Sequence, residues 1–466
     1  MAGTLSRREK FIYGFGDIGF SLTSTILDAY FAIFLTDVVG IQPAIAAIAL
    51  FIGRSWDYIN DPILGHLSDR TRTRWGRRRP FLLFGALPFA IAFTMLWFRP
   101  GWDNQIALAI YYAIAYLFFD TTATLLYMPY YALTPELTDR YDERTTLTTY
   151  RMFFSILGSL LAFTVPIMII GGLVPENAPR VLLMGAIFAA ASAAPMLLVF
   201  LNVKERQEFM AQEQPKIRAS LKAAWKNRPF VFGAVIYLFT WVSMSIVQTA
   251  LLYYIKYVIR REGSSDLLMA AIFVTAILAL PLWERISRKA GKRKAYVFGV
   301  AFWALVQILL ITVTGTTSLG WIVFLCILAG IGVSAAHVLP WSILPDAVEW
   351  DEYQTGERHE GVFYSLVTLM QKVASSIAIP LILLVLQFTG YQPSAAVQSA
   401  GALWGIRIAI GPIPALLLLG GIVFALRYPL GREEFAKVVQ ELEVRRAARE
   451  AASGGDRQAE DPDMAQ

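Results

Sequence analysis

The most regular feature of the chain is a series of long apolar stretches separated by short polar loops. A helix needs about 20 mostly apolar residues to cross the hydrocarbon core of a bilayer. The stretches of that length lie at 11–38, 44–67, 81–99, 105–134, 149–173, 180–202, 229–259, 266–286, 294–314, 318–345, 361–389 and 402–428. The pattern therefore predicts an all-α membrane protein with twelve transmembrane helices.

A polar segment in the middle of the chain divides these helices into two sets of six. We expect an N-terminal six-helix bundle at 1–202, a cytoplasmic linker at 203–228, a C-terminal six-helix bundle at 229–430 and a cytoplasmic, partly disordered tail at 431–466. Two six-helix bundles joined by a charged linker are typical of transporters built from pseudo-equivalent halves. A basic, glycine-containing loop recurs at the same place in each half, which supports this division.

Composition places the chain in lipid rather than in water. Of its 466 residues, 56% are hydrophobic and only 16% are charged, which is far more apolar than a soluble protein of this length requires. The formal net charge of +6 does not indicate nucleic acid, because the basic residues cluster in short loops between apolar stretches.

The basic loops predict the orientation in the membrane. Short loops rich in Lys and Arg favour the cytoplasmic side. Segments 69–79 and 285–294 are basic, whereas the opposite loops near 39–43, 100–104, 315–317 and 390–401 hold almost no Lys or Arg. We therefore expect both termini in the cytoplasm of a multi-pass protein of the plasma membrane, which in a bacterium is the inner membrane.

Few residues are available for redox, metal or nucleophilic chemistry. The chain has one cysteine, Cys326, and three histidines without ligand spacing, His66, His337 and His359. An enzyme should show a nucleophile with its base, or a set of metal ligands, and neither is visible. We expect no enzymatic activity and no cofactor beyond a coupling cation, Na⁺ or H⁺.

The second predicted helix carries two carboxylates at a depth where lipid would penalise them. Asp57 and Asp61 lie four residues apart and share one helix face, with Asn60 beside them. Two carboxylates and an amide oxygen form a hard-oxygen cage that suits a small monovalent cation. The alternative is an ordinary buried pair between Arg54 and Asp57, which would leave Asp61 without a partner.

Two other predicted helices carry polar stripes. The first helix has Asp17, Ser21, Ser24 and Asp28 on one stripe, and the fourth has Asp120, Thr124, Tyr127 and Tyr131. Carboxylates, hydroxyls and aromatic rings together suit a polyhydroxylated ligand such as a sugar. For the hydroxyl groups, hydrogen bonding between helices is an equally good interpretation. For Asp28 and Asp120 we favour a ligand cavity.

A lysine lies deep in the eleventh predicted helix. Lys372 is too far from either end of its apolar stretch to reach the interface, so it needs a carboxylate partner or water. We expect that partner to be Asp57, Asp61 or Asp120, and we expect Gln371 to line the same cavity. The charged residues before this helix are predicted to form cytoplasmic surface ion pairs that hold the inner gate closed: Glu349, Asp351, Glu352, Glu357, Arg358 and Glu360.

Several motifs in these segments resemble the glycoside-pentoside-hexuronide:cation symporters of the major facilitator superfamily. The matching segments are YGFGDIGFS near the start, TDVVG at 36–40, the second-helix motif at 54–80, PYYALTPELTDRYDERTTLTTYR at 129–151 and the acidic block at 345–361. The resemblance covers most of the chain, and its most specific part is the second-helix motif. It implies the major facilitator fold and cation-coupled symport by alternating access.

The resemblance also implies individual site residues. It puts the family's sodium site on Asp57, Asn60, Asp61 and Thr124, and its sugar-contacting arginine and eleventh-helix lysine on Arg151 and Lys372. Galactoside carriers of the family bind sugar through aspartates at positions that are here Ser21 and Tyr127, so galactosides are disfavoured. Asp28 or Asp120 could replace those aspartates from another level of the same helices.

The expected function is Na⁺- or H⁺-coupled symport of a sugar or glycoside. The alternative is cation-coupled transport of a lysolipid-like or other amphipathic solute. The expected partners are this small molecule, the cation and the lipid bilayer, and by analogy the carrier acts as a monomer. The predicted substrate-binding residues are Ser21, Asp28, Asp120, Tyr127, Tyr131, Arg151, Gln371 and Lys372.

Overall fold

The computed structural model describes residues 5–138, 141–205, 224–356, 360–431 and 434–445, and this part of the chain is built from helices. The first set comprises α1 (Arg7–Phe15), α2 (Asp17–Ile26), η1 (Leu27–Phe31), η2 (Phe34–Val39), α3 (Pro43–Ser55), α4 (Asp57–Arg70), α5 (Arg79–Leu96), α6 (Gln105–Leu137), α7 (Tyr141–Ile170), η3 (Pro175–Asn177) and α8 (Ala178–Asn202). The second set comprises α10 (Arg228–Tyr253), η5 (Tyr254–Ile259), η6 (Glu262–Ser264), α11 (Ser265–Ala290), α12 (Lys292–Leu310), α13 (Leu319–Thr355), α14 (Glu360–Phe388), α15 (Ala400–Ile410) and α16 (Pro412–Leu426).

Within the described residues, 10 helical stretches are long and apolar enough to cross a membrane. They correspond to the last ten of the predicted helices. The first two predicted helices are also present, but each is divided into shorter pieces. Residues 7–39 run through α1, α2 and two π-helical turns, η1 and η2, and residues 43–70 are divided at Trp56 into α3 and α4. The all-α membrane architecture predicted from the sequence is confirmed.

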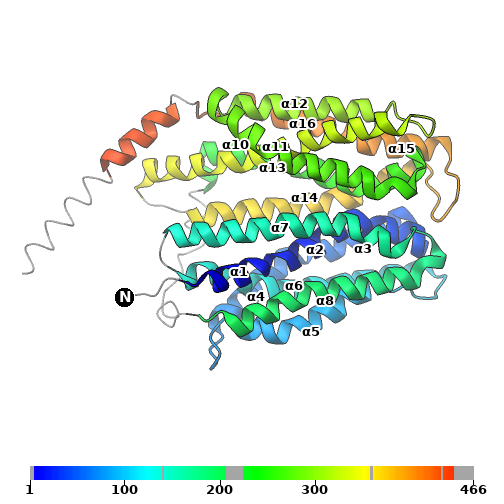
Figure 1. The fold of residues 1–466 in the computed structure, drawn as a ribbon, viewed down its shortest axis with the longest axis horizontal. Coiled ribbons are helices and arrows are strands. Elements are labelled where there is room, and N and C mark those ends of the chain that lie inside the picture. The colour runs from blue at the N-terminus through cyan, green and yellow to red at the C-terminus, as the bar shows by residue number, and fades with distance from the viewer. Residues whose placement is uncertain (1–4, 139–140, 206–223, 357–359, 432–433, 446–466) are drawn as a thin grey trace, which may run out of the picture.

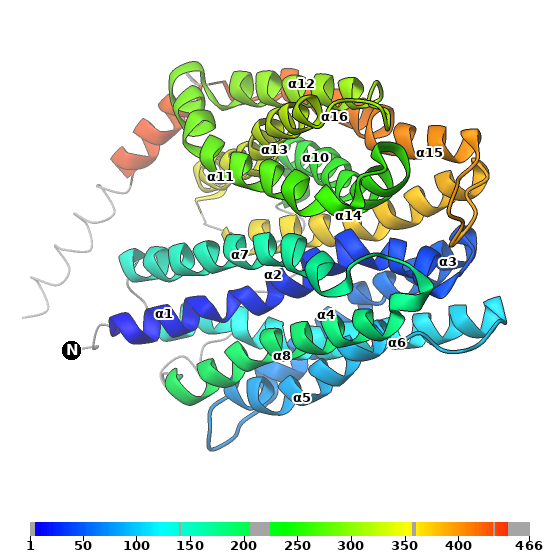
Figure 2. The ribbon, with the colours of Figure 1, turned by 45° about the vertical axis from the view of Figure 1, so that its right-hand side comes forward.

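The helices of each set pack mainly on one another. In the first set α2 packs on α7, and α5 packs on α6 and α8; in the second, α11 packs on α13, and α10 packs on α14 and α16. Figures 1 and 2 show the first set below the second, with α14, α7, α2 and α3 along the boundary. Contacts across this boundary join α3 to α14, α7 to α11, and η1 to α10. We call the two sets the first and second halves.

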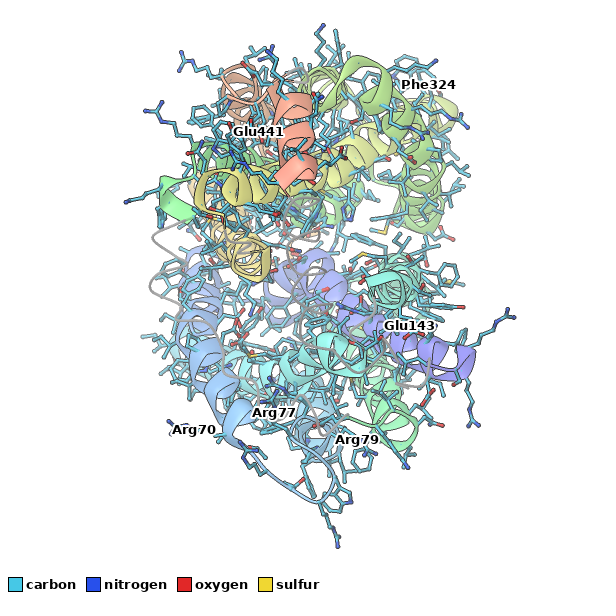
Figure 3. All side chains as sticks on the ribbon, turned by 90° about the vertical axis from the view of Figure 1, so that its left-hand side faces the viewer. Arg70, Arg77, Arg79, Glu143, Phe324 and Glu441 are labelled. Carbon is cyan, nitrogen blue, oxygen red and sulfur yellow. The ribbon has the colours of Figure 1, made fainter. Side chains whose placement is uncertain are left out.

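One end of the molecule carries a cluster of arginines. The end that carries the chain's N-terminus also carries the arginines between α4 and α5, and Figure 3 looks onto it, with Arg70, Arg77 and Arg79 labelled. We call this the basic end and the other the opposite end. The Glu205 carboxylate accepts the backbone N–H groups of Arg77, Arg78 and Arg79 at 2.6, 2.7 and 2.7 Å. It therefore caps the positive N-terminus of α5 and ties it to the segment after α8.

A second acidic residue at the basic end fastens the start of the chain to α7. Glu143 accepts hydrogen bonds from Lys10 Nζ at 2.9 Å, Thr138 Oγ1 at 2.8 Å and the backbone N–H of Leu5 at 3.2 Å. Although burial works against its ionised form, these bonds hold the pKa of Glu143 below its usual value. The first segment of the chain is thus anchored by a charged side chain.

One predicted loop is instead helical. Helix α13 continues to Thr355 rather than ending at 345, although Pro340 and Pro345 lie inside it. The surface location predicted for Asp351 and Glu352 is therefore wrong, because the extra turns carry both side chains into buried positions, 2% and 9% exposed. Of the other predicted members of this group, Glu357 and Arg358, and the Glu360 side chain, lie outside the described residues.

A candidate cation and substrate site between the two halves

Helix α4 presents the acidic motif of the sequence at the boundary between the halves. The break at Trp56 lets α4 start at Asp57, and the Trp56 indole N–H donates to Thr121 Oγ1 of α6 at 2.9 Å. Because Asp57 and Asp61 are four residues apart in α4, both carboxylates lie on one face. The face is turned toward α14 of the second half, as the contacts of Lys372 show.

Lys372 of α14 lies between these two carboxylates. Its Nζ is 3.0 Å from Asp57 Oδ1 and 2.6 Å from Asp61 Oδ2. The carboxylate partner predicted for this buried lysine is thus confirmed, and it is Asp57 with Asp61. About 30% of each of the Asp61 and Lys372 side chains remains exposed, so the pair is not enclosed by protein. The ammonium group stands where a free monovalent cation would be attracted by the same oxygens.

Asn60 and Thr124 complete the group that the resemblance assigned to sodium. Thr124 Oγ1 donates to Asp61 Oδ1 at 3.2 Å, and Asn60 Nδ2 is 3.4 Å from both the backbone oxygen and Oδ2 of Asp120. The structure therefore brings all four residues together, with Asp120 beside them. Among the described residues, no three His, Cys, Asp or Glu side chains form a metal-binding cluster. Two carboxylates with amide and hydroxyl oxygens are instead donors suited to a monovalent ion.

Arg54 pairs with a different aspartate from the one considered in the sequence. Its Nη2 lies 2.8 Å from Asp28 Oδ1, and its guanidinium stacks over the Tyr116 ring at 5.6 Å. The direct pair between Arg54 and Asp57 is therefore not formed, because η1 carries Asp28 to the arginine. Asp28 also receives a hydrogen bond at its backbone oxygen from Thr249 of α10, at 2.9 Å. The carboxylate is neutralised inside the protein.

Some of the remaining predicted substrate residues have partly exposed side chains, and the others are buried. Arg151 lies 3.5 Å from Asp17 and stacks over Tyr131 at 4.5 Å, next to the exposed ring of Phe20. Tyr127 is 3% exposed among aromatic rings.

Two further predicted substrate residues have their polar groups engaged inside the protein. Ser21 is 3% exposed and donates to the backbone oxygens of its own helix. Gln371 accepts from Tyr237 at 3.3 Å. In this conformation Lys372 is the most exposed of the predicted substrate residues for which an ion pair is described, at 29%, and Arg151 is 16% exposed. The substrate roles of all these residues stay predictions.

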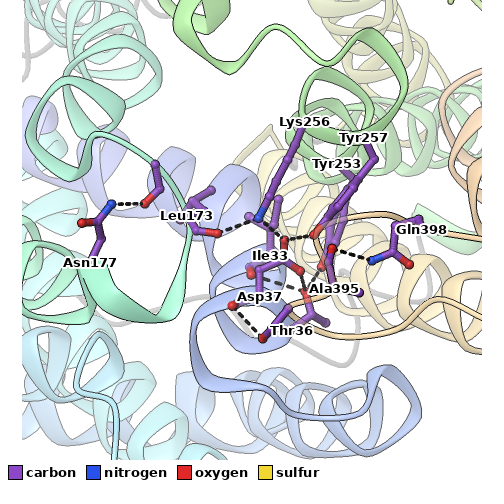
Figure 4. Close-up of polar contacts among 12 residues, drawn as sticks. Ile33, Thr36, Asp37, Leu173, Asn177, Tyr253, Lys256, Tyr257, Ala395 and Gln398 are labelled. Atoms are coloured by element: carbon purple, nitrogen blue, oxygen red, sulfur yellow. Dashed lines mark hydrogen bonds and ion pairs between the residues drawn. The ribbon is translucent and has the colours of Figure 1, made fainter. Parts of the chain in front are cut away.

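The sequence interpretation missed a buried carboxylate at the opposite end. Asp37 of η2 is fully buried and accepts from Lys256 Nζ and Tyr257 Oη, both at 2.5 Å (Figure 4). It also accepts from the hydroxyl of Tyr391. Its backbone oxygen accepts from Ser394 at 2.9 Å. These four donors belong to the second half, while Thr36 Oγ1 of the first half also donates to Asp37 Oδ1 at 3.0 Å, so Asp37 joins the halves at this end. The signal that could have found it is a carboxylate inside an apolar helix, the same signal that found Asp57.

These features define a class of protein. The described residues contain ten helices long and apolar enough to cross a membrane, arranged in two packed halves with a charged pair at their boundary, and these are the features of a secondary transporter. The chain belongs to the MFS/sugar transport protein family, whose model matches residues 12–432. Members are transporters rather than enzymes, and the chain is a cation-coupled symporter of the major facilitator superfamily.

Relatives of known name agree with this assignment. The chain is 32% identical to an uncharacterized symporter of Synechocystis sp., over 94% of this chain and 96% of that protein. It is 28% identical to the sodium-dependent lysophosphatidylcholine symporter 1-A of Danio rerio, over 91% and 86%. The Homo sapiens sodium-dependent lysophosphatidylcholine symporter 1 is 26% identical, over 97% and 90%.

Solved structures support the fold. A D-xylose-proton symporter superposes with a TM-score of 0.65 at 14% identity, covering 90% of this chain and 96% of that one. The nucleoside transporter NupG superposes with a TM-score of 0.61 at 12% identity, covering 90% and 99%. The major facilitator fold expected from the sequence is therefore confirmed, and the chain is a multi-pass membrane protein.

Proposed function

We propose that the coupling cation is Na⁺ and that it binds Asp57, Asn60, Asp61 and Thr124. The observation that carries this proposal is the Lys372 ammonium group between Asp57 and Asp61. A positive charge from the second half already satisfies two carboxylates of the first half, so an external cation competes for the same oxygens. The names of the lysophosphatidylcholine symporters support sodium as that cation.

The proposed mechanism is an exchange of positive charges at one site. When Na⁺ takes the oxygens of Asp57 and Asp61, Lys372 loses its partners and the charged contact between α4 and α14 is released. The bundles 1–202 and 229–430 can then rock about the site, provided that the contacts at the opposite end break as well. We place the basic end and both termini in the cytoplasm, because short loops rich in arginine favour that side.

We propose an amphipathic, lysolipid-like solute as the substrate. A sugar needs many free hydrogen-bonding groups, yet the candidate groups are engaged internally: Asp28 by Arg54, Ser21 by its own helix and Asp120 by Asn60. Arg151, which is stacked on Tyr131 beside exposed Phe20, offers a cation and an apolar ring, as an anionic head group on an acyl chain requires. The lysophosphatidylcholine symporters support this choice.

A sugar or glycoside is the second candidate. It is favoured by the description of the matching family as MFS/sugar transport proteins. The two candidates differ in the part of the ligand that the site must hold, since a sugar is read through its hydroxyl groups and a lysolipid through one charged head and an apolar chain.

Uptake into proteoliposomes separates these possibilities. Labelled lysophosphatidylcholine, a glycoside and a uronide would each be offered under an inward Na⁺ gradient and, separately, an inward H⁺ gradient. We expect Na⁺-driven accumulation of the lysolipid, abolished by Asp61→Asn and retained by Asp103→Asn, which changes an exposed loop carboxylate. Accumulation of the glycoside alone would select the second candidate, and accumulation under the H⁺ gradient alone would exclude sodium.

A further inference from the structure

Asp120 of α6 is the acidic residue near the site whose partner is not a cation. Its side chain is 7% exposed, and no ion pair to Asp120 is found within the described residues. It lies one helical turn before Thr124 and next to the carboxyl group of Asp57. A buried carboxylate costs free energy unless it is hydrogen-bonded or near a positive charge, so its position beside this site needs a physical reason.

The contacts of Asp120 point to Asn60. The Asn60 amide nitrogen is 3.4 Å from both the backbone oxygen and Oδ2 of Asp120. The backbone oxygen can only accept a hydrogen bond, so the group of Asn60 that faces it must be the donor. An asparagine that faces two acceptors must turn its NH₂ group toward them, which directs its carbonyl oxygen away from Asp120. The described residues include no hydrogen-bond donor to that carbonyl oxygen, which leaves it available as a ligand.

We propose that Asp120 is a positioning residue of the cation site: it holds the Asn60 NH₂ group so that the amide oxygen, rather than the amide nitrogen, faces the coupling ion. The inference rests on the proposed cation site and assigns to it a residue that the sequence pattern had placed in the substrate cavity. An inverted Asn60 would present N–H groups to the ion and repel it. Asp120 thus acts on the ion through Asn60.

Burial supports a role toward the ion rather than toward the solute. Asp120 and Asn60 are 7% and 3% exposed, whereas about 30% of the Asp61 side chain is open to solvent. Asp120 and Asn60 are therefore more enclosed than Asp61, and less accessible to a solute.

The test measures Na⁺ binding separately from transport. Isothermal titration calorimetry would follow Na⁺ binding to the full-length, substrate-free protein in nanodiscs, with N-methyl-D-glucamine chloride holding ionic strength constant. Asp120→Asn should weaken Na⁺ binding roughly 10- to 100-fold, the usual effect of losing a residue that orients a metal ligand. Uptake at saturating Na⁺ should keep its maximal rate and its apparent affinity for the solute. Asp103→Asn, in an exposed loop, is the matched control and should bind Na⁺ as the parent does.

A double-mutant cycle with Asn60→Ala tests the route of the effect. If Asp120 acts through Asn60, the Asp120→Asn substitution costs much less affinity once Asn60 is alanine. If the two single losses of Na⁺ affinity instead multiply in the double variant, the inference is wrong. It is also wrong if a folded Asp120→Asn protein binds Na⁺ as the parent does, or if its affinity for the solute is lower at saturating Na⁺. A parent protein that binds no Na⁺ would instead refute the proposed cation site itself.

Discussion

Replacing Asp37 with asparagine should open the end of the molecule that this carboxylate closes. Asp37 belongs to the first half, and its donors Lys256, Tyr257 and Tyr391 belong to the second. An amide has nearly the shape of a carboxylate, but it removes the charge and turns one acceptor into a donor that faces other donors. The variant therefore loses the charged contact between the halves without leaving a cavity.

The size of the effect follows from the burial of Asp37. Removing one partner of a buried, hydrogen-bonded charge pair costs roughly 3–5 kcal/mol. These contacts exist only while the halves meet at this end, and water can replace them when the halves part, so most of the cost falls on the closed conformation. At about 3 kcal/mol the ratio of open to closed molecules rises roughly 100-fold, because about 1.4 kcal/mol corresponds to a factor of ten.

Cysteine labelling can measure this ratio. Ser245 of α10 is 2% exposed and lies eleven residues before Lys256, or roughly 16 Å along the helix. In a Ser245→Cys protein whose native Cys326 is replaced by alanine, a membrane-impermeant maleimide reaches the introduced thiol from the opposite end only when that end is open. Asp37→Asn should raise the labelling rate in intact cells at least about tenfold.

The control variant for this experiment is Asp103→Asn, which changes an exposed carboxylate at the same end. It should label at the parent rate. If Asp37→Asn also labels at the parent rate, while the purified protein is monodisperse and still binds Na⁺, then the Asp37 contacts do not hold this end closed and the reasoning is wrong.

Other parts of the structure give predictions of smaller scope. Lys372→Met removes the positive charge that competes with Na⁺ for Asp57 and Asp61, so calorimetry should show tighter Na⁺ binding. Uptake should fall at least about tenfold, because no positive charge replaces Na⁺ when it leaves the site. Glu205→Gln should lower the stability of α5 by about 1 kcal/mol in thermal unfolding, whereas exposed Glu284→Gln should not. Because the pKa of Glu143 is lowered in the folded protein, its contacts stabilise the fold at neutral pH, and this stabilisation is lost as the pH falls through that pKa. The thermal midpoint should therefore fall at acidic pH, and Glu143→Gln should make that fall smaller.

The helices and the acidic motif could be predicted from sequence because both depend on local spacing. Apolar length alone located the crossing segments, and a spacing of four residues placed Asp57 and Asp61 on one face. The need of Lys372 for a carboxylate partner followed from its depth. Each of these inferences uses one segment and the free energy of moving charge into lipid, so no knowledge of the packing was required.

The partners of the other charges could not be predicted in this way. The spacing of the first helix predicted a polar stripe, but spacing says nothing about which side chains of other helices meet it. Asp17 and Asp28 lie eleven residues apart and pair with different arginines, Arg151 and Arg54, which the packing of α7 and α3 supplies. The choice of partner was set by backbone geometry that hydrophobic periodicity does not encode.

A continuous chain of contacts links the cation site to the closed end. Arg54 lies about one turn before Asp57 and pairs with Asp28 at 2.8 Å. The backbone oxygen of Asp28 accepts a hydrogen bond from Thr249 of α10 at 2.9 Å. Helix α10 continues into η5, where Lys256 pairs with Asp37. Proximity alone does not establish energetic coupling. It does identify the contact to break, since Thr249→Val would remove the hydrogen bond between the halves while keeping the side chain's volume. If the site and the closed end are coupled through this contact, Na⁺ should change the labelling rate of the Ser245→Cys thiol in the parent background and change it less when Thr249→Val is added.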